Sequence, residues 1–250
     1  MVAWDIKHLL KTIVTSAAYR QSSNGNKELL QRDPDNRLLA RGPRFRLSAD
    51  MIRDQALFAS GLLVEKLGGP SVKPYSPPGL IKELHGTDED AQDHGPSLYR
   101  RSLYTYWKRT VAPPALMTFD AANRETCVVR ETRTNTPLQA LNLLNDVTYV
   151  EAARVLAQRV MKEAGPNNAN RVTLAFRLTT SRLPQTRELQ ILQTGLEQHL
   201  QHYRRDKDAA LKLISRGETP RDAKLHMTEL AAYTALCNTL LNLDEVITRE

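Results

Sequence analysis

Apolar residues recur at helical spacing in several segments of the chain, and most of these segments have capping residues at one end. In residues 4–20, Asp5 has the side chain of an N-cap, and Ile6, Leu9 and Ile13 belong to one apolar stripe. A second predicted helix begins after Ser48 and ends at the break formed by residues 68–70. Further helices are predicted over residues 171–178, 189–200, 206–216 and 229–241. The pattern predicts a mainly α fold, an irregular multi-helix domain with long Pro/Gly-rich and charged loops and at most a few short strands.

The stretch from Arg133 to Asp146 has the sharpest local signal in the sequence. Thr136 suits an N-cap, Pro137 suits the first helical position, and Gln139 completes a capping box. An apolar run at helical spacing follows and continues to Val160. These features predict one long amphipathic helix. A well-capped helix needs no function to explain it, so this signal is in the first place architectural.

The segments between the predicted helices are polar or rich in proline and glycine. Residues 21–36 are predicted as a polar loop, residues 44–47 as a short extended segment, and residues 127–133 as a short strand. Residues 68–80 form a Pro/Gly-rich loop, and an acidic loop with the stretch Asp88–His94 follows it. The break at residues 165–168 divides the chain into residues 1–164, which contain the Arg133–Asp146 block, and a helical subdomain of residues 165–250 that we expect to pack on them.

Composition and charge exclude several classes of protein. The hydrophobic share of 41% and the charged share of 25% are typical of a globular chain rather than a disordered one. No apolar run approaches the roughly 18 residues of a membrane span, and Asp5, Lys7 and His8 interrupt any signal-peptide core at the N-terminus. The net charge of +7 raises the question of nucleic acid, but the basic residues are dispersed, which favours only weak attraction to anions.

The sequence predicts no metal site and no cofactor. Cys127 and Cys237 form no metal-binding or haem-attachment motif, and they suit two ordinary thiols better than one disulfide. The acidic loop lacks the spacing of an EF-hand, and His199 with His202 lacks a third ligand.

Two neighbouring segments have the composition of a site. Residues 98–110 interleave aromatic and basic side chains, which suits stacking on a sugar, a base or a peptide, and residues 120–133 alternate in charge. The candidate site residues are Tyr104, Trp107, Asp120, Arg124, Arg130, Glu131, Arg133 and Asn135. A glycosidase would use two carboxylates, and Asp120 with Glu125 or Glu131 is the pair to test. The structural alternative, which we favour, is that the rings pack in the core and the charges form ion pairs.

Several blocks together resemble a known family. They are TSAAYRQSS, RLSADMIRDQAL, GGPSVKPY, YRRSLYTYWKRT, RTNTPLQALNLLND and the terminal LLNLDEVITRE. In this order they resemble the C-terminal domain of unknown function of planctomycete-type cytochrome-c-associated proteins, the planctomycete PSD-type domain. In these relatives the domain begins before the position of Trp4, so the chain resembles an N-terminally truncated copy.

The resemblance implies a periplasmic or otherwise extracytoplasmic binding or assembly module that accompanies a c-type cytochrome domain or other upstream domains. Haem is expected only in those upstream domains, and the family offers no catalytic residues to carry over. Two alternatives stay open: an enzyme acting on polysaccharide with a site around Asp120–Arg133, and a weak binder of nucleic acid or anions.

Overall fold

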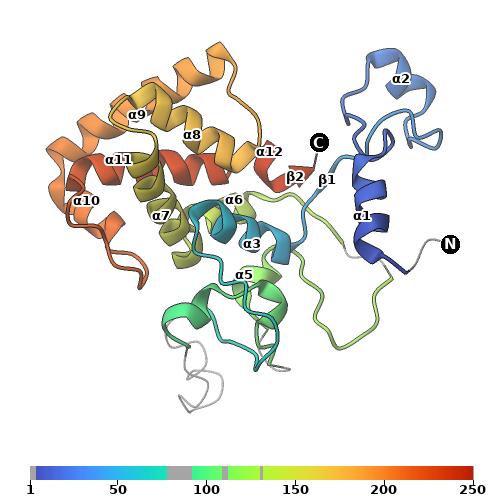
Figure 1. Cartoon of the computed structure of the whole chain (residues 1–250), viewed down its shortest axis with the longest axis horizontal. Helices are drawn as coiled ribbons and strands as arrows, with labels where there is room; N and C mark the ends of the chain where they lie inside the picture. The colour runs from blue at the N-terminus through green and yellow to red at the C-terminus, as the bar shows by residue number, and fades with distance from the viewer. Residues whose placement is uncertain (1–3, 78–91, 109–111, 130–131, 250) are drawn as a thin grey trace. The chain divides into compact units, whose positions relative to one another are not determined.

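The structure is a computed structural model that describes residues 4–77, 92–108, 112–129 and 132–249 (Figure 1). Its regular structure is almost entirely helical, and the described residues contain one two-stranded sheet. The predicted mainly α fold is therefore confirmed. The chain forms two compact units: a small one of residues up to Arg46 together with Thr248 and Arg249, and a large one of Leu47–Ile247.

The small unit contains α1 (Ile6–Thr15), α2 (Lys27–Arg32) and the antiparallel strands β1 (Phe45–Arg46) and β2 (Thr248–Arg249). Asp5 caps α1 as predicted, because its carboxylate accepts from the His8 N–H at 3.0 Å. The predicted apolar stripe of α1 forms on one face, but no residue of α1 is buried. The prediction of a loop over residues 21–36 was wrong in part: Asn26 accepts from the Leu29 N–H at 2.7 Å and starts α2.

The first helix of the large unit is α3 (Ala49–Ser60), with Ser48 as its N-cap. The predicted end at residues 68–70 was wrong. Gly61 adopts the left-handed conformation with φ of 85° and ends the helix, since a glycine meets no steric penalty there. The chain then runs through two 3₁₀ turns, η1 (Gly95–Tyr99) and η2 (Ser102–Tyr104), to the short α5 (Pro114–Met117).

Arg53 fastens these turns to α3. Its buried guanidinium donates to the carbonyl oxygens of Leu98 at 2.6 Å and Arg100 at 2.9 Å. Burial lowers the pKa of Arg53, while the neighbouring Asp54 acts in the opposite direction. A buried arginine thus satisfies backbone carbonyls that have no strand or helix to pair with.

The single long helix predicted from Leu138 to Val160 is two helices, α6 (Pro137–Asn145) and α7 (Val147–Glu163). Asp146 lies between them in an extended conformation and is the C-cap of one helix and the N-cap of the next. Its side chain accepts from the Thr148 N–H at 2.9 Å, so the carboxylate stabilises the start of α7. The break also leaves Leu138, Leu141 and Leu144 exposed rather than buried.

The predicted capping box is present at the start of α6, and its glutamine does more than cap. Gln139 is only 1% exposed, and its Oε1 accepts from the Thr136 N–H at 3.2 Å. Its Nε2 donates to the Thr118 carbonyl at 3.0 Å and to the Thr134 hydroxyl at 3.1 Å. Gln139 therefore joins α6 to the end of α5 and to the preceding loop.

The main core lies around α7 and the apolar α11 (Met227–Leu241), which contact each other extensively (Figure 1). Around them lie α8 (Asn168–Thr180), α9 (Thr186–Arg205) and α10 (Lys207–Ile214), and α12 (Asp244–Ile247) ends the unit. Ala152, Ala153 and Ala157 are completely buried on α7, and small side chains let the helices approach closely. The helices predicted over this half of the chain are confirmed.

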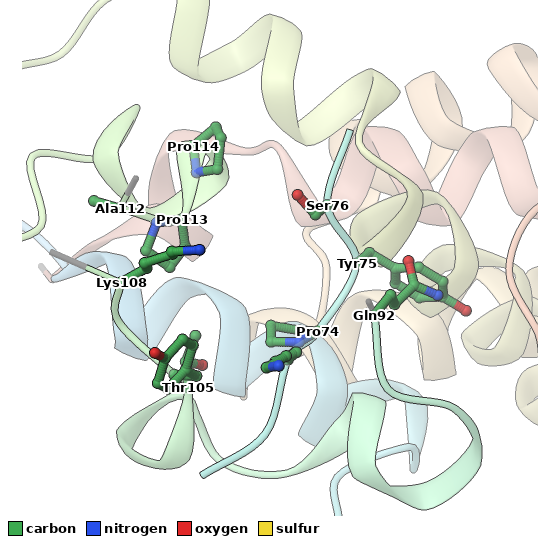
Figure 2. Close-up of a pocket in the computed structure, with 11 residues that line it drawn as sticks. Pro74, Tyr75, Ser76, Gln92, Thr105, Lys108, Ala112, Pro113 and Pro114 are labelled. Atoms are coloured by element: carbon green, nitrogen blue, oxygen red, sulfur yellow. The ribbon is translucent and has the colours of Figure 1, made fainter. Parts of the chain in front are cut away.

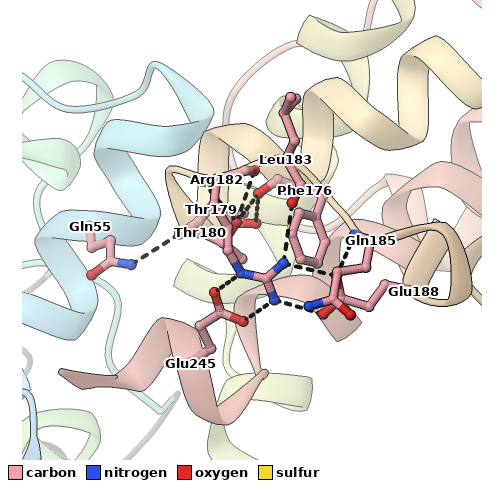
Figure 3. Close-up of polar contacts among 9 residues, drawn as sticks. All are labelled: Gln55, Phe176, Thr179, Thr180, Arg182, Leu183, Gln185, Glu188 and Glu245. Atoms are coloured by element: carbon pink, nitrogen blue, oxygen red, sulfur yellow. Dashed lines mark hydrogen bonds and ion pairs between the residues drawn. The ribbon is translucent and has the colours of Figure 1, made fainter. Parts of the chain in front are cut away.

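Arg182 joins three of these helices (Figure 3). Its guanidinium donates to both carboxylate oxygens of Glu188 on α9, at 2.8 and 2.6 Å, and is also paired with Glu245 of α12. It lies over the ring of Phe176 on α8, 4.7 Å from the centroid. Pairing with Arg182 lowers the pKa of Glu188 to about 2.

Three smaller expectations have distinct outcomes. The described residues of the segment predicted as a strand, 127–129 and 132–133, belong to no strand. Both cysteines are free; Cys127 is exposed and Cys237 is buried. The break expected at residues 165–168 coincides with the turn between α7 and α8, while the division of the chain at that point stays a prediction.

Within the described ranges, no helix has both the length and the apolar character that crossing a membrane requires.

Candidate functional site

The two aromatic residues of the predicted site have structural contacts. The Tyr104 hydroxyl accepts from the Gly68 N–H at 2.8 Å, and its ring lies 3.8 Å from the Arg100 guanidinium. Trp107 packs against the main core, and the guanidinium of Arg124 lies 4.6 Å from its ring centroid. Tyr104 therefore fixes the backbone at Gly68. Trp107 and Arg124 are two members of the predicted site that the fold brings into contact.

The remaining predicted residues are spread along an exposed segment. Asp120 accepts from both the N–H and the hydroxyl of Thr134, each at 2.8 Å. Arg124 lies 3.9 Å from Asp50, and Arg133 and Asn135 are exposed. Arg130 and Glu131 lie outside the described residues. These residues stay a predicted site. The one carboxylate among their described members, that of Asp120, already accepts two hydrogen bonds from Thr134.

A second group of polar residues surrounds a cavity of about 100 Å³ between α3, α5 and the junction of α6 with α7. We call it the Tyr149 cavity. Prolines, Ala115 and Leu116 form the apolar part of its lining. The polar part consists of Arg53, Tyr75, Thr118, Asn142, Asp146, Thr148 and Tyr149. The Tyr149 hydroxyl and the Asn142 Nδ2 are both buried and have no hydrogen-bond partner among the described residues.

The fold holds these groups rigidly. Tyr149 is 1% exposed, and Phe119 packs edge-on against its ring with 6.3 Å between the centroids. Asn142 lies on the last turns of α6, and Asp146 lies at the helix junction. Burial raises the pKa of Asp146, while hydrogen bonds from Thr148 act in the opposite direction. Burial also raises the pKa of the Tyr149 hydroxyl, which therefore stays protonated and can donate.

A second hollow, of about 70 Å³, adjoins the Tyr149 cavity; we call it the lysine pocket (Figure 2). The two hollows share the wall formed by Pro74, Tyr75, Pro113 and Pro114. The lysine pocket is also lined by Lys73, Gln92, Thr105, Tyr106 and Lys108. Figure 2 shows Pro74 and Ser76 on one side of the pocket and Lys108 with residues 112–114 on the other.

Tyr75 connects this shared wall to a buried ion pair. Its hydroxyl donates to Glu151 at 2.8 Å and accepts from the Glu218 N–H at 2.8 Å. Glu151 also accepts from the Tyr99 hydroxyl at 3.0 Å and the Thr219 N–H at 2.7 Å, and Arg154 lies 3.3 Å away. The wall is therefore anchored to α7 through a fully hydrogen-bonded carboxylate.

The described residues contain no group of three histidine, cysteine, aspartate or glutamate side chains placed to hold a metal ion. Most of the acidic loop lies outside the described residues. Of its described members, His94 contacts Glu218 at 2.6 Å and Asp93 accepts from the Lys73 N–H at 2.9 Å. His199 and His202 both contact the ring of Tyr203.

Sequence reasoning missed both hollows, although it came close to one of them. Asn142 and Asp146 belong to the Arg133–Asp146 block, yet we interpreted that block as helix architecture. The sequence did contain one signal for the helix junction. Asp146 is a good N-cap residue inside an apolar run, and Thr148 follows two residues later, so a second helix start could have been predicted there. No local signal identifies Thr105 or Lys108 as lining residues, because the opposite wall lies some thirty residues away.

A family model named PSD1, described as a protein of unknown function (DUF1553), matches residues 2–196. No curated protein and no solved structure matches the chain. The matched range covers α1 to most of α9 and includes every residue of both hollows. Since the match spans well over half of the sequence, the chain belongs to the PSD1 family of proteins of unknown function.

Proposed function

We propose that the large unit is a non-catalytic binding domain whose ligand occupies the Tyr149 cavity. The observation that carries the proposal is the pair of buried polar groups, the Tyr149 hydroxyl and the Asn142 Nδ2, that have no partner among the described residues. A buried polar group without a partner costs about 1–3 kcal/mol, so native proteins nearly always satisfy such groups. A ligand that accepts from both groups would remove this cost.

The size and chemistry of the cavity define the ligand class. A cavity of roughly 150 Å³ holds a benzene molecule, so about 100 Å³ suits a group of a few heavy atoms. Asn142 and Tyr149 offer donors, and Asp146 offers an acceptor. This combination suits a small neutral group that both donates and accepts, such as a sugar hydroxyl or an amide.

A binding role fits better than acid–base catalysis. Asp146 is the one carboxylate among the described residues that line the cavity, whereas a glycosidase uses two. The enzyme alternative around Asp120–Arg133 has its weakest point at Asp120, whose carboxylate accepts two hydrogen bonds from Thr134. A half-buried carboxylate that is engaged in this way favours a structural role for that segment.

Tyr149→Phe tests the proposal because it removes only the hydroxyl. Glucose, N-acetylglucosamine and acetamide serve as neutral probes, and binding is followed by calorimetry and by the shift in melting temperature. We expect at least one probe to stabilise the wild type and to lose its effect on Tyr149→Phe, which is itself as stable as the wild type or more so. Tyr203→Phe, on α9 and away from the cavity, is the matched control and should respond like the wild type.

Two results would refute the proposal. The first is a wild type that none of the three probes stabilises. The second is a ligand-free Tyr149→Phe variant that melts several degrees below the wild type, since this would mean that the hydroxyl already has a stabilising partner in the folded chain.

We further propose that the domain works beside a c-type cytochrome domain outside the cytoplasm and carries no cofactor itself. The support is the resemblance of the sequence blocks to planctomycete-type cytochrome-c-associated proteins. The test is to mix the purified chain with a purified c-type cytochrome domain of such a relative and to follow haem absorbance in size-exclusion chromatography. Haem that never elutes with the chain at micromolar concentrations would contradict the proposal.

A further inference from the structure

We infer that the lysine pocket binds the acetyl group of an N-acetylated ligand whose remaining part occupies the neighbouring Tyr149 cavity. The inference rests on the proposed function and deepens it, because the two hollows share a wall and would hold two parts of one molecule. Its own support is the apolar lining, one buried hydroxyl and the size of the lysine pocket.

Most of the pocket wall is apolar. Pro74 lies on one side and Pro113 with Pro114 on the other (Figure 2). A proline has no N–H, so these positions add apolar surface without adding a backbone donor. The Tyr75 hydroxyl donates to Glu151 at 2.8 Å, so Tyr75 offers the pocket its ring. A wall of this kind favours a methyl group over a strongly polar group.

The two lysines of the wall are engaged within the chain. Lys73 and Lys108 both have interactions of their own there. The Lys73 ammonium also lies 5.4 Å from the centroid of the Tyr106 ring. Neither lysine therefore requires an anion as a counter-ion, and a neutral ligand group suits the pocket.

A buried hydroxyl supplies one directional contact. Thr105 is only 4% exposed, and its Oγ1 has no hydrogen-bond partner in the part of the chain that the structure describes. Because Thr105 lines the pocket, this hydroxyl is available to donate to a carbonyl oxygen bound there. An acetyl group combines the methyl group that the apolar wall favours with the one acceptor that Thr105 lacks.

The backbone holds Thr105 in place before any ligand arrives. The Thr105 N–H donates to the Ser102 carbonyl at 3.0 Å, and the Tyr106 N–H donates to the Val72 carbonyl at 2.8 Å. The Val72 N–H donates in turn to the Tyr104 carbonyl at 2.8 Å. Since hydrogen bonds fix the chain on both sides of the hydroxyl, binding orders few groups.

The size of the pocket matches an acetyl group. A cavity of roughly 150 Å³ holds a benzene molecule, so about 70 Å³ suits about three heavy atoms. The methyl carbon, the carbonyl carbon and the carbonyl oxygen of an acetyl group fill this space.

On the same scale the two hollows together suit about seven heavy atoms, which is the size of N-acetylethanolamine. This molecule has a hydroxyl on the carbon next to the one that bears the acetylated nitrogen. The hydroxyl provides the group that both donates and accepts in the Tyr149 cavity. The ligand class is therefore an N-acetylated amino alcohol, which includes the N-acetylated amino sugars.

Calorimetry and thermal shift with three neutral probes test the inference. The probes are N-acetylethanolamine, N-butanoylethanolamine and ethylene glycol. We expect the wild type to bind N-acetylethanolamine about tenfold more tightly than either of the others, because ethylene glycol leaves the lysine pocket empty and the butanoyl chain is too long for it.

Thr105→Val keeps the shape of the side chain and removes only the hydroxyl. It should weaken binding of N-acetylethanolamine about two- to tenfold and leave binding of ethylene glycol unchanged. Its ligand-free stability should not fall, since the hydroxyl that it removes has no partner among the described residues. Thr194→Val, at an exposed position of α9, is the matched control and should bind all three probes like the wild type.

The design separates this inference from the proposed function. Equal affinities for the acetyl and butanoyl probes, equal affinities of the wild type and Thr105→Val for N-acetylethanolamine, or no binding of N-acetylethanolamine would overturn the inference. If ethylene glycol still binds in a Tyr149-dependent way in that case, the proposed function stands. If Tyr149→Phe leaves every affinity unchanged while the acetyl preference depends on Thr105, the inference is supported and the proposed function fails.

Discussion

Glu151→Gln is the substitution that most directly tests how the buried ion pair stabilises this fold. The Glu151 side chain is 0% exposed, and the Arg154 side chain beside it is 1% exposed. The carboxylate accepts from Tyr75, Tyr99 and Thr219 in addition to Arg154. The substitution keeps the size of the side chain and removes only the charge and one acceptor position.

The expected cost follows from these contacts. Hydrogen bonds to a charged group contribute about 1.5–3 kcal/mol each, against about 0.5–1.5 kcal/mol for neutral pairs, so several bonds weaken together. The Arg154 charge also stays buried without its counter-ion, and breaking such a pair costs about 3–5 kcal/mol. We therefore expect Glu151→Gln to lower the free energy of unfolding by about 3–5 kcal/mol, which corresponds to about 6–20 °C in melting temperature for a chain of this size.

Urea unfolding followed by circular dichroism gives the free energy of unfolding directly. Glu163→Gln is the matched control on the same helix, because Glu163 forms an exposed pair with Arg159 and should cost less than about 0.5 kcal/mol. Adding Arg154→Met to Glu151→Gln should recover part of the loss, since no unpaired charge then stays buried. A loss below about 1 kcal/mol for Glu151→Gln would refute the reasoning.

Gly217 tests the same cluster from the opposite side. A Cβ at this position would lie 2.1 Å from the Glu151 Cδ, and the backbone has a φ of 84°. Gly217→Ala therefore has to displace the carboxylate as well as adopt a strained backbone conformation. We expect Gly217→Ala to lower the free energy of unfolding by more than about 1 kcal/mol in urea titrations. An unchanged midpoint would contradict the close approach of Gly217 to Glu151.

Three further predictions concern single side chains. Gln139→Ala should lower the free energy of unfolding by about 2–3 kcal/mol in urea titrations, because it removes three hydrogen bonds at a buried position; an unchanged midpoint would contradict the role given to this residue. Arg182→Lys should cost about 1 kcal/mol, because lysine cannot donate in the bidentate geometry, and the site is partly exposed; the loss should shrink when the melting temperature is measured in high salt, and a salt-independent loss would indicate packing instead. Burial raises the pKa of Asp146, so its ionisation in the folded state opposes folding as the pH rises through its ordinary value of about 4. Asp146→Asn should therefore have a higher melting temperature than the wild type at pH 7, and the difference should disappear below about pH 4. Equal melting temperatures at pH 7 would contradict the inference that burial raises the pKa of Asp146.

Local chemistry in the sequence determined where most helices begin. Asp5, Ser48 and Thr136 were recognised as helix starts because capping depends on a few neighbouring residues. The apolar periodicity of α9 and α11 was likewise sufficient to predict both helices. For this reason the mainly α class was predictable without tertiary information, as was the family through its sequence blocks.

Errors arose where two local signals competed. Gly61 ended α3 early, although apolar residues continue at helical spacing beyond it. Asp146 divided the predicted long helix because its carboxylate caps a new helix. The apolar residues on both sides of Asp146 keep helical spacing, so the periodicity alone does not reveal this new helix start. The strand predicted at residues 127–133 had suitable residues, but its described part has no partner strand, and strands require one.

Only the tertiary structure decided the candidate site. Arg53, Thr105, Asn142 and Tyr149 look ordinary in the sequence, and each gains significance from burial and from the partners it has or lacks. The residues that looked functional, Tyr104 and Asp120, have loop contacts that account for them structurally. Capping and periodicity depend on residues a few positions apart, whereas a cavity depends on segments that are distant in the chain, so the sequence determined the elements and packing alone determined the hollows between them.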